Sequence, residues 1–285
     1  MAKFHNYSIN IGGRLVDIDR PQVMGILNVT PDSFYSGSRC GVDEEVIRHR
    51  VRQMVAEGAD MIDIGGYSSR PGACDISPEE EYSRLSTGLR IIHEEAPEGM
   101  IVSVDTFRAG VARRCVEECG AHIINDISGG DLDSNMYATV AELRVPYILM
   151  HMRGTPATMN KLTQYECVTA DVIKDLQAKA FHLRQLGVND IIIDPGFGFS
   201  KTVEQNYEMM RDLGEFLAMD YPVLVGISRK LMIYRLLGTS PEEALNGTTV
   251  LNTIAALSGS HILRVHDVKE AVEAVTIVGA MSCGL

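Results

Sequence analysis

Eight short apolar runs recur along the chain, and a longer amphipathic stretch follows each of them. The runs are VMGILNV, MIDIGG, IVSVDT, HIINDIS, YILMHM, DIIIDPG, PVLVGIS and HILRVHD. They are continuously apolar rather than alternating, which is typical of parallel strands that are covered on both faces. Between the first three runs, residues 43–60 and 77–97 carry helix signals, with Asp43 and Ser77 as N-caps, Pro78 in a first turn and Gly58 as a stop.

Eight strand-helix units in 285 residues predict a closed (β/α)8 TIM barrel of the α/β class. The alternative is an open doubly wound sheet, which normally carries a Gly-rich phosphate fingerprint after its first strand. The first run continues as MGILNVTPDSF and has no G-x-G-x-x-G. We therefore expect one barrel domain over residues 1–285, preceded by a β-hairpin at about residues 5–18 that turns at Gly12-Gly13 and plugs the barrel bottom.

The formal net charge of −12 argues against a general nucleic-acid surface, which needs a basic face. Any anion site must therefore be local.

The N-terminal residues lack an apolar signal region, and no run of eighteen apolar residues occurs. We expect no membrane partner and a cytoplasmic location. The six cysteines contain no C-x-x-C pair, and we interpret Cys115 and Cys119 as ordinary helix positions.

Polar residues follow the apolar runs, where the strands of a barrel carry its active site. Acceptors are Asp105, Asn125 and Asp194; cations or donors are Arg70, Lys230, Arg264 and His266. Singly, such residues are often caps or turn formers, and we favour that interpretation for Thr106, Asp126 and Asp267. Asp63 is equally compatible with a structural and a functional role. As a set, these residues predict a polar ligand that has both a donor edge and negative charge.

The loop DPGFGFSK adds two glycines for close backbone approach and the flat faces of Phe197 and Phe199. A tightly held zinc is not indicated, since no H-E-x-x-H occurs. Mg2+ shared with substrate phosphates needs only one or two protein oxygens, and Asn28 is a candidate ligand. No G-x-S-x-G motif indicates a protein nucleophile, so we expect chemistry between two bound substrates.

Eight motifs, in order along nearly the whole chain, resemble those of the dihydropteroate synthase family of pterin-binding barrels. They are MGILNVTPDSF, GGYSSRPG, SVDTFR, INDISGG, MHMRGTP, IIIDPGFGFSK, GISRK and LRVHDV. The resemblance implies a transferase that condenses p-aminobenzoate with 6-hydroxymethyl-7,8-dihydropterin pyrophosphate, releasing pyrophosphate in folate biosynthesis. It also implies Mg2+ as cofactor and a homodimer formed through helices late in the chain. Loss of pyrophosphate before amine attack, an SN1-like course, is our hypothesis for the mechanism.

The resemblance also implies roles for individual residues. The pterin would be held by Asp105, Asn125, Asp194 and Lys230. Pyrophosphate would be bound by Arg264 and His266, with Mg2+ at Asn28 and charge neutralisation from Arg70. The p-aminobenzoate site would be bounded by Ser69, Arg70, Pro71, Phe199 and Lys230. Because Lys230 is expected to face the barrel mouth, we expect Arg229 to pair with a neighbouring acid or loop.

Two departures from the family pattern concern the p-aminobenzoate side. Many members have Glu where this chain has Tyr67, and commonly Ser where it has Leu231. Leu231 leaves the aminobenzoate carboxylate to Lys230, Ser69 and backbone N–H groups. Two alternatives stay open: a non-catalytic pterin-binding paralogue, and a pterin-dependent methyltransferase on the same barrel. The loops after the first two strands are predicted to be mobile and to close over bound substrate.

Overall fold

The computed structural model of the chain describes residues 4–30, 43–68 and 75–282. Its strands are β1 (Tyr7–Ile11), β2 (Arg14–Ile18), β3 (Gln22–Asn28), β4 (Met61–Gly65), β5 (Ile101–Asp105), β6 (Ile123–Asp126), β7 (Tyr147–Met150), β8 (Ile191–Asp194), β9 (Leu224–Val225) and β10 (Ile262–Val265). Its helices are α1 (Glu44–Ala56), α2 (Pro78–Glu95), α3 (Ala109–Cys119), α4 (Met136–Leu143), α5 (Val168–Gln185), α6 (Val203–Arg211), α7 (Leu213–Phe216), α8 (Leu231–Leu237), α9 (Leu245–Leu257) and α10 (Val268–Ser282), with short 3-10 turns at Met159–Lys161 and Leu217–Met219.

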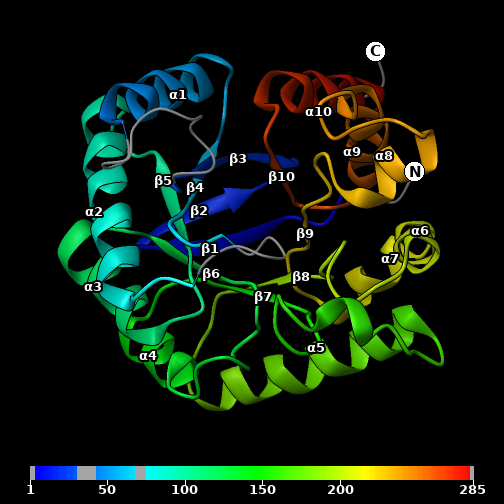
Figure 1. Cartoon of the computed structure of the whole chain (residues 1–285), viewed down its shortest axis with the longest axis horizontal. Helices are drawn as coiled ribbons and strands as arrows, with labels where there is room; N and C mark the ends of the chain where they lie inside the picture. Colours follow the sequence, from blue (N-terminus) through cyan, green and yellow to red (C-terminus); the bar gives the residue numbers. More distant parts are fainter. Residues whose placement is uncertain (1–3, 31–42, 69–74, 283–285) are drawn as a thin grey trace.

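Eight parallel strands form one sheet in the order β8-β7-β6-β5-β4-β3-β10-β9. A bridge between Ile193 and Val223 joins its two ends, where the Ile193 amide donates to the Pro222 carbonyl at 2.9 Å. The helices lie in a ring around the strands (Figure 1). The predicted (β/α)8 barrel with an N-terminal hairpin is therefore confirmed. Much of the two loops predicted to be mobile, residues 31–42 and 69–74, falls outside the described residues.

The predicted helix caps are present. The Asp43 carboxylate accepts from the Glu45 amide at 3.0 Å, and the Ser77 hydroxyl accepts from the Glu80 amide at 3.1 Å. Both side chains thereby satisfy an amide that has no partner within the helix. These local signals fix where α1 and α2 begin, and thus where the loops that precede them end.

The barrel interior is apolar at its bottom. Each of the eight strands contributes one inward side chain to this layer: Met24, Met61, Ile101, Ile123, Ile148, Ile192, Leu224 and Ile262. Ile9, Ile11 and Ile18 of the hairpin β1-β2 pack against the same cluster. The hairpin thus closes the bottom, as predicted. Since side chains alternate along a strand, the next inward residues lie one layer higher, toward the carboxyl ends.

β9 is shorter than its apolar run predicts, with two residues in the strand rather than most of residues 222–228. Pro222 has no amide to donate to the ladder, and Arg229 adopts a left-handed backbone with φ of 54°. The chain therefore leaves the sheet early and presents residues 226–230 at the barrel mouth.

No helix in the described part of the chain combines the length and apolarity needed to cross a bilayer.

Candidate active site

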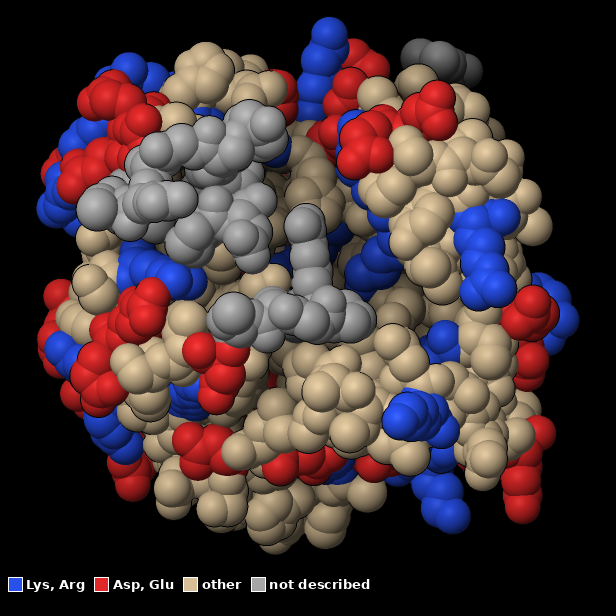
Figure 2. Space-filling model, in the orientation of Figure 1, with Lys and Arg blue, Asp and Glu red and all other residues tan. Residues whose placement is uncertain are grey.

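A cavity of about 440 Å³ opens at the carboxyl ends of the strands. Figure 2 shows basic side chains inside the central hollow of this face, whereas acidic side chains lie mainly around its margin. Among the predicted site residues, the cavity is lined by Asn28, Asp105, Phe199, Lys230, Arg264 and His266. The structure thus brings together residues from five strand ends. Ser69, Arg70 and Pro71 lie outside the described residues.

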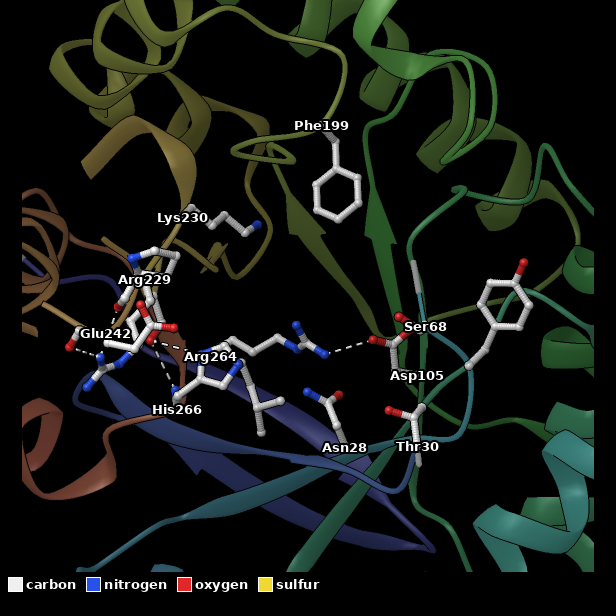
Figure 3. Close-up of a pocket in the computed structure, with 14 residues that line it drawn as sticks. Asn28, Thr30, Ser68, Asp105, Phe199, Arg229, Lys230, Glu242, Arg264 and His266 are labelled. Carbon is white, nitrogen blue, oxygen red and sulfur yellow. Dashed lines mark hydrogen bonds and ion pairs between the residues drawn. The ribbon is translucent and has the colours of Figure 1, made fainter. Parts of the chain in front are cut away.

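Arg264 on β10 lies between two carboxylates, those of Asp63 and Asp105, and Figure 3 shows its ion pair with Asp105. Its Nε lies 2.6 Å from Asp63 Oδ2, and its Nη2 lies 2.7 Å from Asp105 Oδ2. Burial alone would lower the pKa of Arg264, but the charges of Asp63 and Asp105 raise it above its ordinary value. Burial raises the pKa of Asp105 to about 7, against the opposing effect of Arg264. Near neutral pH, Asp105 can therefore exist with or without its proton.

From the sequence, Asp63 was equally compatible with a structural and a functional role, and the structure connects it to two site residues. It is fully buried in the middle of β4, and its Oδ2 also accepts from Asn125 Nδ2 at 3.0 Å. One carboxylate thus orients both Arg264 and Asn125, two of the predicted ligand contacts. Its inward position on β4 is the signal that identifies it, because an acid inside an apolar strand is costly unless it is paired.

Asp194 and Lys230 supply a second pair of opposite charges near the floor. Asp194 Oδ1 accepts from the Gly196 amide at 2.8 Å, while burial raises the pKa of its carboxyl against the charge of Lys230. Lys230 Nζ donates to the Phe197 carbonyl at 2.5 Å and lies 4.7 Å from the centre of the Phe199 ring. Burial lowers the pKa of Lys230 to about 8, although Asp194 opposes this. Asn125 and Asp194 are buried and do not line the cavity.

Lys201 organises the loop after β8, although no sequence pattern predicted a role for it. Its Nζ donates to the carbonyls of Gly196 and Phe199, each at 3.0 Å, and lies 3.0 Å from His151 Nδ1. Burial lowers the pKa of Lys201 to about 7 and that of His151 to about 2, so the imidazole is neutral. A side chain at Gly196 would place its Cβ 2.0 Å from the His151 carbonyl, so only glycine fits there.

His266 and Arg229 have different environments at the edge of the cavity. His266 Nδ1 lies 3.2 Å from the Ser228 hydroxyl, and burial followed by the charge of Arg264 lowers its pKa to about 4. The ring is therefore an uncharged donor at pH 7. Arg229 binds Asp267 through Nε at 2.8 Å and Nη2 at 2.9 Å, and also donates to the Glu242 carbonyl. This confirms that Arg229 pairs with a neighbouring acid and loop.

Leu231 begins α8 and is 45% exposed. Its side chain carries no polar atom, and the residue does not line the cavity. Tyr67 and Ser68, both after β4, also line the cavity, although they were not among the predicted contacts. Since Tyr67 had appeared only as a departure from a family pattern, its position in the wall could not be inferred without the structure.

Comparison with known proteins agrees with this geometry. The family described as "Pterin binding enzyme" matches residues 24–266. The chain is 42% identical to dihydropteroate synthase of Escherichia coli K12 over 270 residues, covering 94% of each chain. It is 40% identical to the Mycobacterium leprae enzyme over 268 residues, covering 91% of this chain and 93% of the relative.

Two solved structures are similar over nearly their whole length. Dihydropteroate synthase of Xanthomonas albilineans with 4-aminobenzoic acid has a TM-score of 0.89 at 36% identity, covering 99% of this chain and 100% of that one. The Yersinia pestis enzyme in a sulfonamide complex has a TM-score of 0.90 at 37% identity, with 98% and 100% covered. Together with the residues assembled at the barrel mouth, these likenesses show that the chain belongs to the dihydropteroate synthase family of pterin-binding enzymes.

Proposed function

We propose that the chain condenses p-aminobenzoate with 6-hydroxymethyl-7,8-dihydropterin pyrophosphate to give 7,8-dihydropteroate and pyrophosphate. The observation that carries this proposal is the combination, at one barrel mouth, of buried acceptors with Arg264 and Lys230. A bare pterin needs the acceptors, but a substrate that also carries pyrophosphate needs cations and donors nearby. A methyltransferase on the same barrel has no use for an anion pocket, and a non-catalytic paralogue needs only the pterin floor.

The pterin is assigned to the floor of the cavity. Its guanidine-like edge presents paired N–H donors, and a carboxylate accepts two parallel hydrogen bonds from such an edge. Asp194 is the best-placed acceptor. Although burial raises the pKa of its carboxyl, the charge of Lys230 opposes this and favours the carboxylate. Asn125 and Asp105 provide further polar contacts, and Asp63 keeps Asn125 in place.

The aminobenzoate is assigned to the rim. Phe199 offers a flat face for its ring, and the Lys230 ammonium lies close enough to that face to attract the carboxylate. Ser69, Arg70 and Pro71 complete this side in the proposal. With Leu231 in place of the common serine, the carboxylate depends more strongly on Lys230.

Pyrophosphate is assigned to the side of the cavity formed by Arg264, His266 and Asn28. The charge of Arg264 is partly offset by two carboxylates, so its attraction for an anion is greatest when Asp105 is protonated. His266 is neutral at pH 7 and donates a hydrogen bond or gains a proton when the anion arrives. Arg70 adds a further cation in the proposal. These groups favour charge that develops on the departing pyrophosphate.

Asn28 is a suitable ligand for a Mg2+ ion that would also bind the pyrophosphate. This residue ends β3, next to Gly65 on β4, where an added Cβ would come into ordinary van der Waals contact with Asn28 Oδ1, at 3.5 Å. The bare glycine therefore leaves room beside an amide oxygen, a ligand type that Mg2+ accepts together with substrate phosphates. When bound, the ion would neutralise charge on the leaving group. Within the described residues, no cluster of three His, Cys, Asp or Glu offers an all-protein metal site.

We propose that the C–O bond to pyrophosphate breaks before the amine attacks. The pterin ring delocalises positive charge from its methylene, and the carboxylates of Asp105 and Asp194 lie at the floor to favour that charge. The arylamine held over Phe199 then forms the C–N bond and releases a proton. The contribution of the protein is positioning, electrostatics and exclusion of water.

The proposal includes a homodimer in the cytoplasm. Val250 and Ile254 on α9, and Ile277 and Met281 on α10, are large apolar side chains that are exposed. Each pair is four residues apart and so lies on one helix face, and the two helices pack together. An exposed apolar face of this kind suits a partner subunit.

The cysteines that the structure describes, Cys115, Cys119 and Cys167, are free, which agrees with a reducing compartment.

Pyrophosphate release tests the function. The purified chain is supplied with the pterin pyrophosphate, Mg2+ and p-aminobenzoate, and pyrophosphate and dihydropteroate are both measured. We expect stoichiometric formation of the two products. Pterin binding without product would favour the non-catalytic paralogue, whereas methyl transfer from a reduced folate to a corrinoid protein would favour the methyltransferase.

A further inference from the structure

Lys201 is a buried lysine whose hydrogen-bond partners are all uncharged. Its Nζ lies 3.0 Å from each of three acceptors, which are the carbonyls of Gly196 and Phe199 and Nδ1 of the neutral His151. An ammonium has three N–H donors, so these acceptors satisfy all of them. Burying a lysine without a carboxylate partner is costly, and an apolar side chain would fill the space at lower cost. The contacts of Lys201 therefore point to a role in arranging the loop.

Two of these contacts close a tight turn in the loop. The amide of Phe199 donates to the Gly196 carbonyl at 3.1 Å, and Lys201 joins the carbonyls of the same two residues. Ser200 is a second donor to the Phe199 carbonyl, at 2.8 Å, and its hydroxyl also accepts from the Arg153 amide at 3.0 Å. Both side chains that hold this carbonyl are buried. The backbone of Phe199 is therefore fixed from two directions.

Phe199 depends on these contacts more than its neighbour Phe197 does. Phe197 is fully buried in the main core, so packing fixes its position. Phe199 is only partly buried at the cavity, and it packs against a small separate cluster of one isoleucine and three methionines. Methionine side chains adapt readily to a shifted neighbour. The position of the Phe199 ring is therefore set largely by its backbone, which Lys201 and Ser200 hold.

We propose that Lys201 and Ser200 act as positioning residues for p-aminobenzoate, because they hold the ring of Phe199 in place beside Lys230. The centre of that ring lies 4.7 Å from Lys230 Nζ (Figure 3). A benzoate ring that stacks on Phe199 thus keeps its carboxylate within reach of the ammonium. The inference rests on the proposed function, which assigns the aminobenzoate to the Phe199 face and the pterin to the floor. Neither positioning residue takes part in bond making or breaking.

The pterin floor depends on other contacts. Asp194 ends the paired strand β8, and its carbonyl accepts from the His151 amide at 3.0 Å. Asn125 is held by Asp63 at 3.0 Å, on strands that the loop after β8 does not include. Loss of Lys201 should therefore weaken the binding of the amine substrate much more than that of the pterin.

The first test compares two largely buried lysines. Lys201→Met keeps the length of the side chain and removes its three hydrogen bonds. Lys179→Met is the matched control, because Lys179 on α5 is 14% exposed and binds Asp131 at 2.8 Å and Asp175 at 3.4 Å. For Lys201→Met we expect KM for p-aminobenzoate to rise about fivefold or more, and KM for the pterin pyrophosphate to change by less than about twofold. Lys179→Met should change neither KM.

A milder variant covers the case in which Lys201→Met does not fold. Ser200→Ala removes the second donor to the Phe199 carbonyl and leaves the buried lysine in place. It should raise KM for p-aminobenzoate about twofold to threefold and leave KM for the pterin pyrophosphate unchanged. Amide hydrogen exchange of a peptide covering residues 196–200 should be faster in both variants than in Lys179→Met.

The inference is overturned if the folded variants raise both KM values equally or leave KM for p-aminobenzoate unchanged. Absence of turnover by the wild-type chain would instead contradict the proposed function. Hydrogen exchange needs no turnover, so it tests the positioning of the turn even then. Faster exchange in the two variants supports that positioning, and unchanged exchange refutes it.

Discussion

At the scale of single residues, Asp194 has the most consequential prediction. Asp194→Ala removes the paired acceptor for the pterin edge, and we expect the dissociation constant for the pterin to rise about 100-fold, as for the loss of a charge-assisted bidentate contact. Calorimetric titration with a pterin measures it. Asp190→Ala is the control, because Asp190 precedes the same strand at the opposite end of the barrel, where it accepts from the Asn10 amide at 3.3 Å. Unchanged affinity in Asp194→Ala would place the pterin elsewhere.

His266 makes a second residue-scale prediction, about pH. Burial holds its pKa at about 4 in the free protein, so the ring is neutral at pH 7. A bound pyrophosphate favours the protonated ring and raises that pKa, so binding takes up a proton. Because the bound form holds more protons, this contribution to affinity increases as the pH falls from about 7 to about 5. His266→Gln should lose this contribution, visible as a flatter pH dependence of pyrophosphate affinity relative to the wild type. Identical pH profiles for the two proteins would contradict it.

At the scale of elements, the hairpin β1-β2 is separable from the chemistry. Ile18 is fully buried against the bottom layer of the barrel, whereas Leu15 of the same hairpin is 71% exposed. We expect Ile18→Ala to lower the free energy of unfolding by about 3 kcal/mol through the cavity it leaves. Leu15→Ala should stay within about 0.5 kcal/mol. Denaturant unfolding measures both. Since the active site lies at the other end of the barrel, kcat of the folded Ile18→Ala protein should equal that of the wild type, and a large fall would show coupling between the two ends.

At the scale of the whole molecule, the prediction concerns assembly. An acidic residue on the apolar face of α9 and α10 should prevent a dimer, because burying an unpaired charge is costly. We expect sedimentation to give a dimer for the wild type and a monomer for Ile254→Glu combined with Ile277→Glu. Phe181→Glu on α5 is the control, since Phe181 is 66% exposed and lies on a different helix. A monomeric wild type, or a dimer that only the control variant dissociates, would refute this interface.

Sequence patterns alone determined the barrel because its signals are local. Continuous apolar runs, the caps at Asp43 and Ser77, and the turn at Gly12-Gly13 each depend on a few adjacent residues. The same patterns placed Asp105, Lys230, Arg264 and His266 at strand ends, since alternation along a strand tells which residues face inward. They overestimated β9, whose pairing is limited by the early exit of the chain from the sheet.

The tertiary structure decided which of these side chains act together. Arg264 binds Asp63 and Asp105 across sequence separations of 201 and 159 residues, contacts that exist only after the barrel closes. The role of Lys201 also depends on a loop that folds back toward another strand, so no local pattern reveals it. The sequence motifs therefore indicated that the ligand has both a donor edge and negative charge. Barrel closure determined the charge state and orientation of the groups that receive it, because burial and pairing act only once distant strands become neighbours.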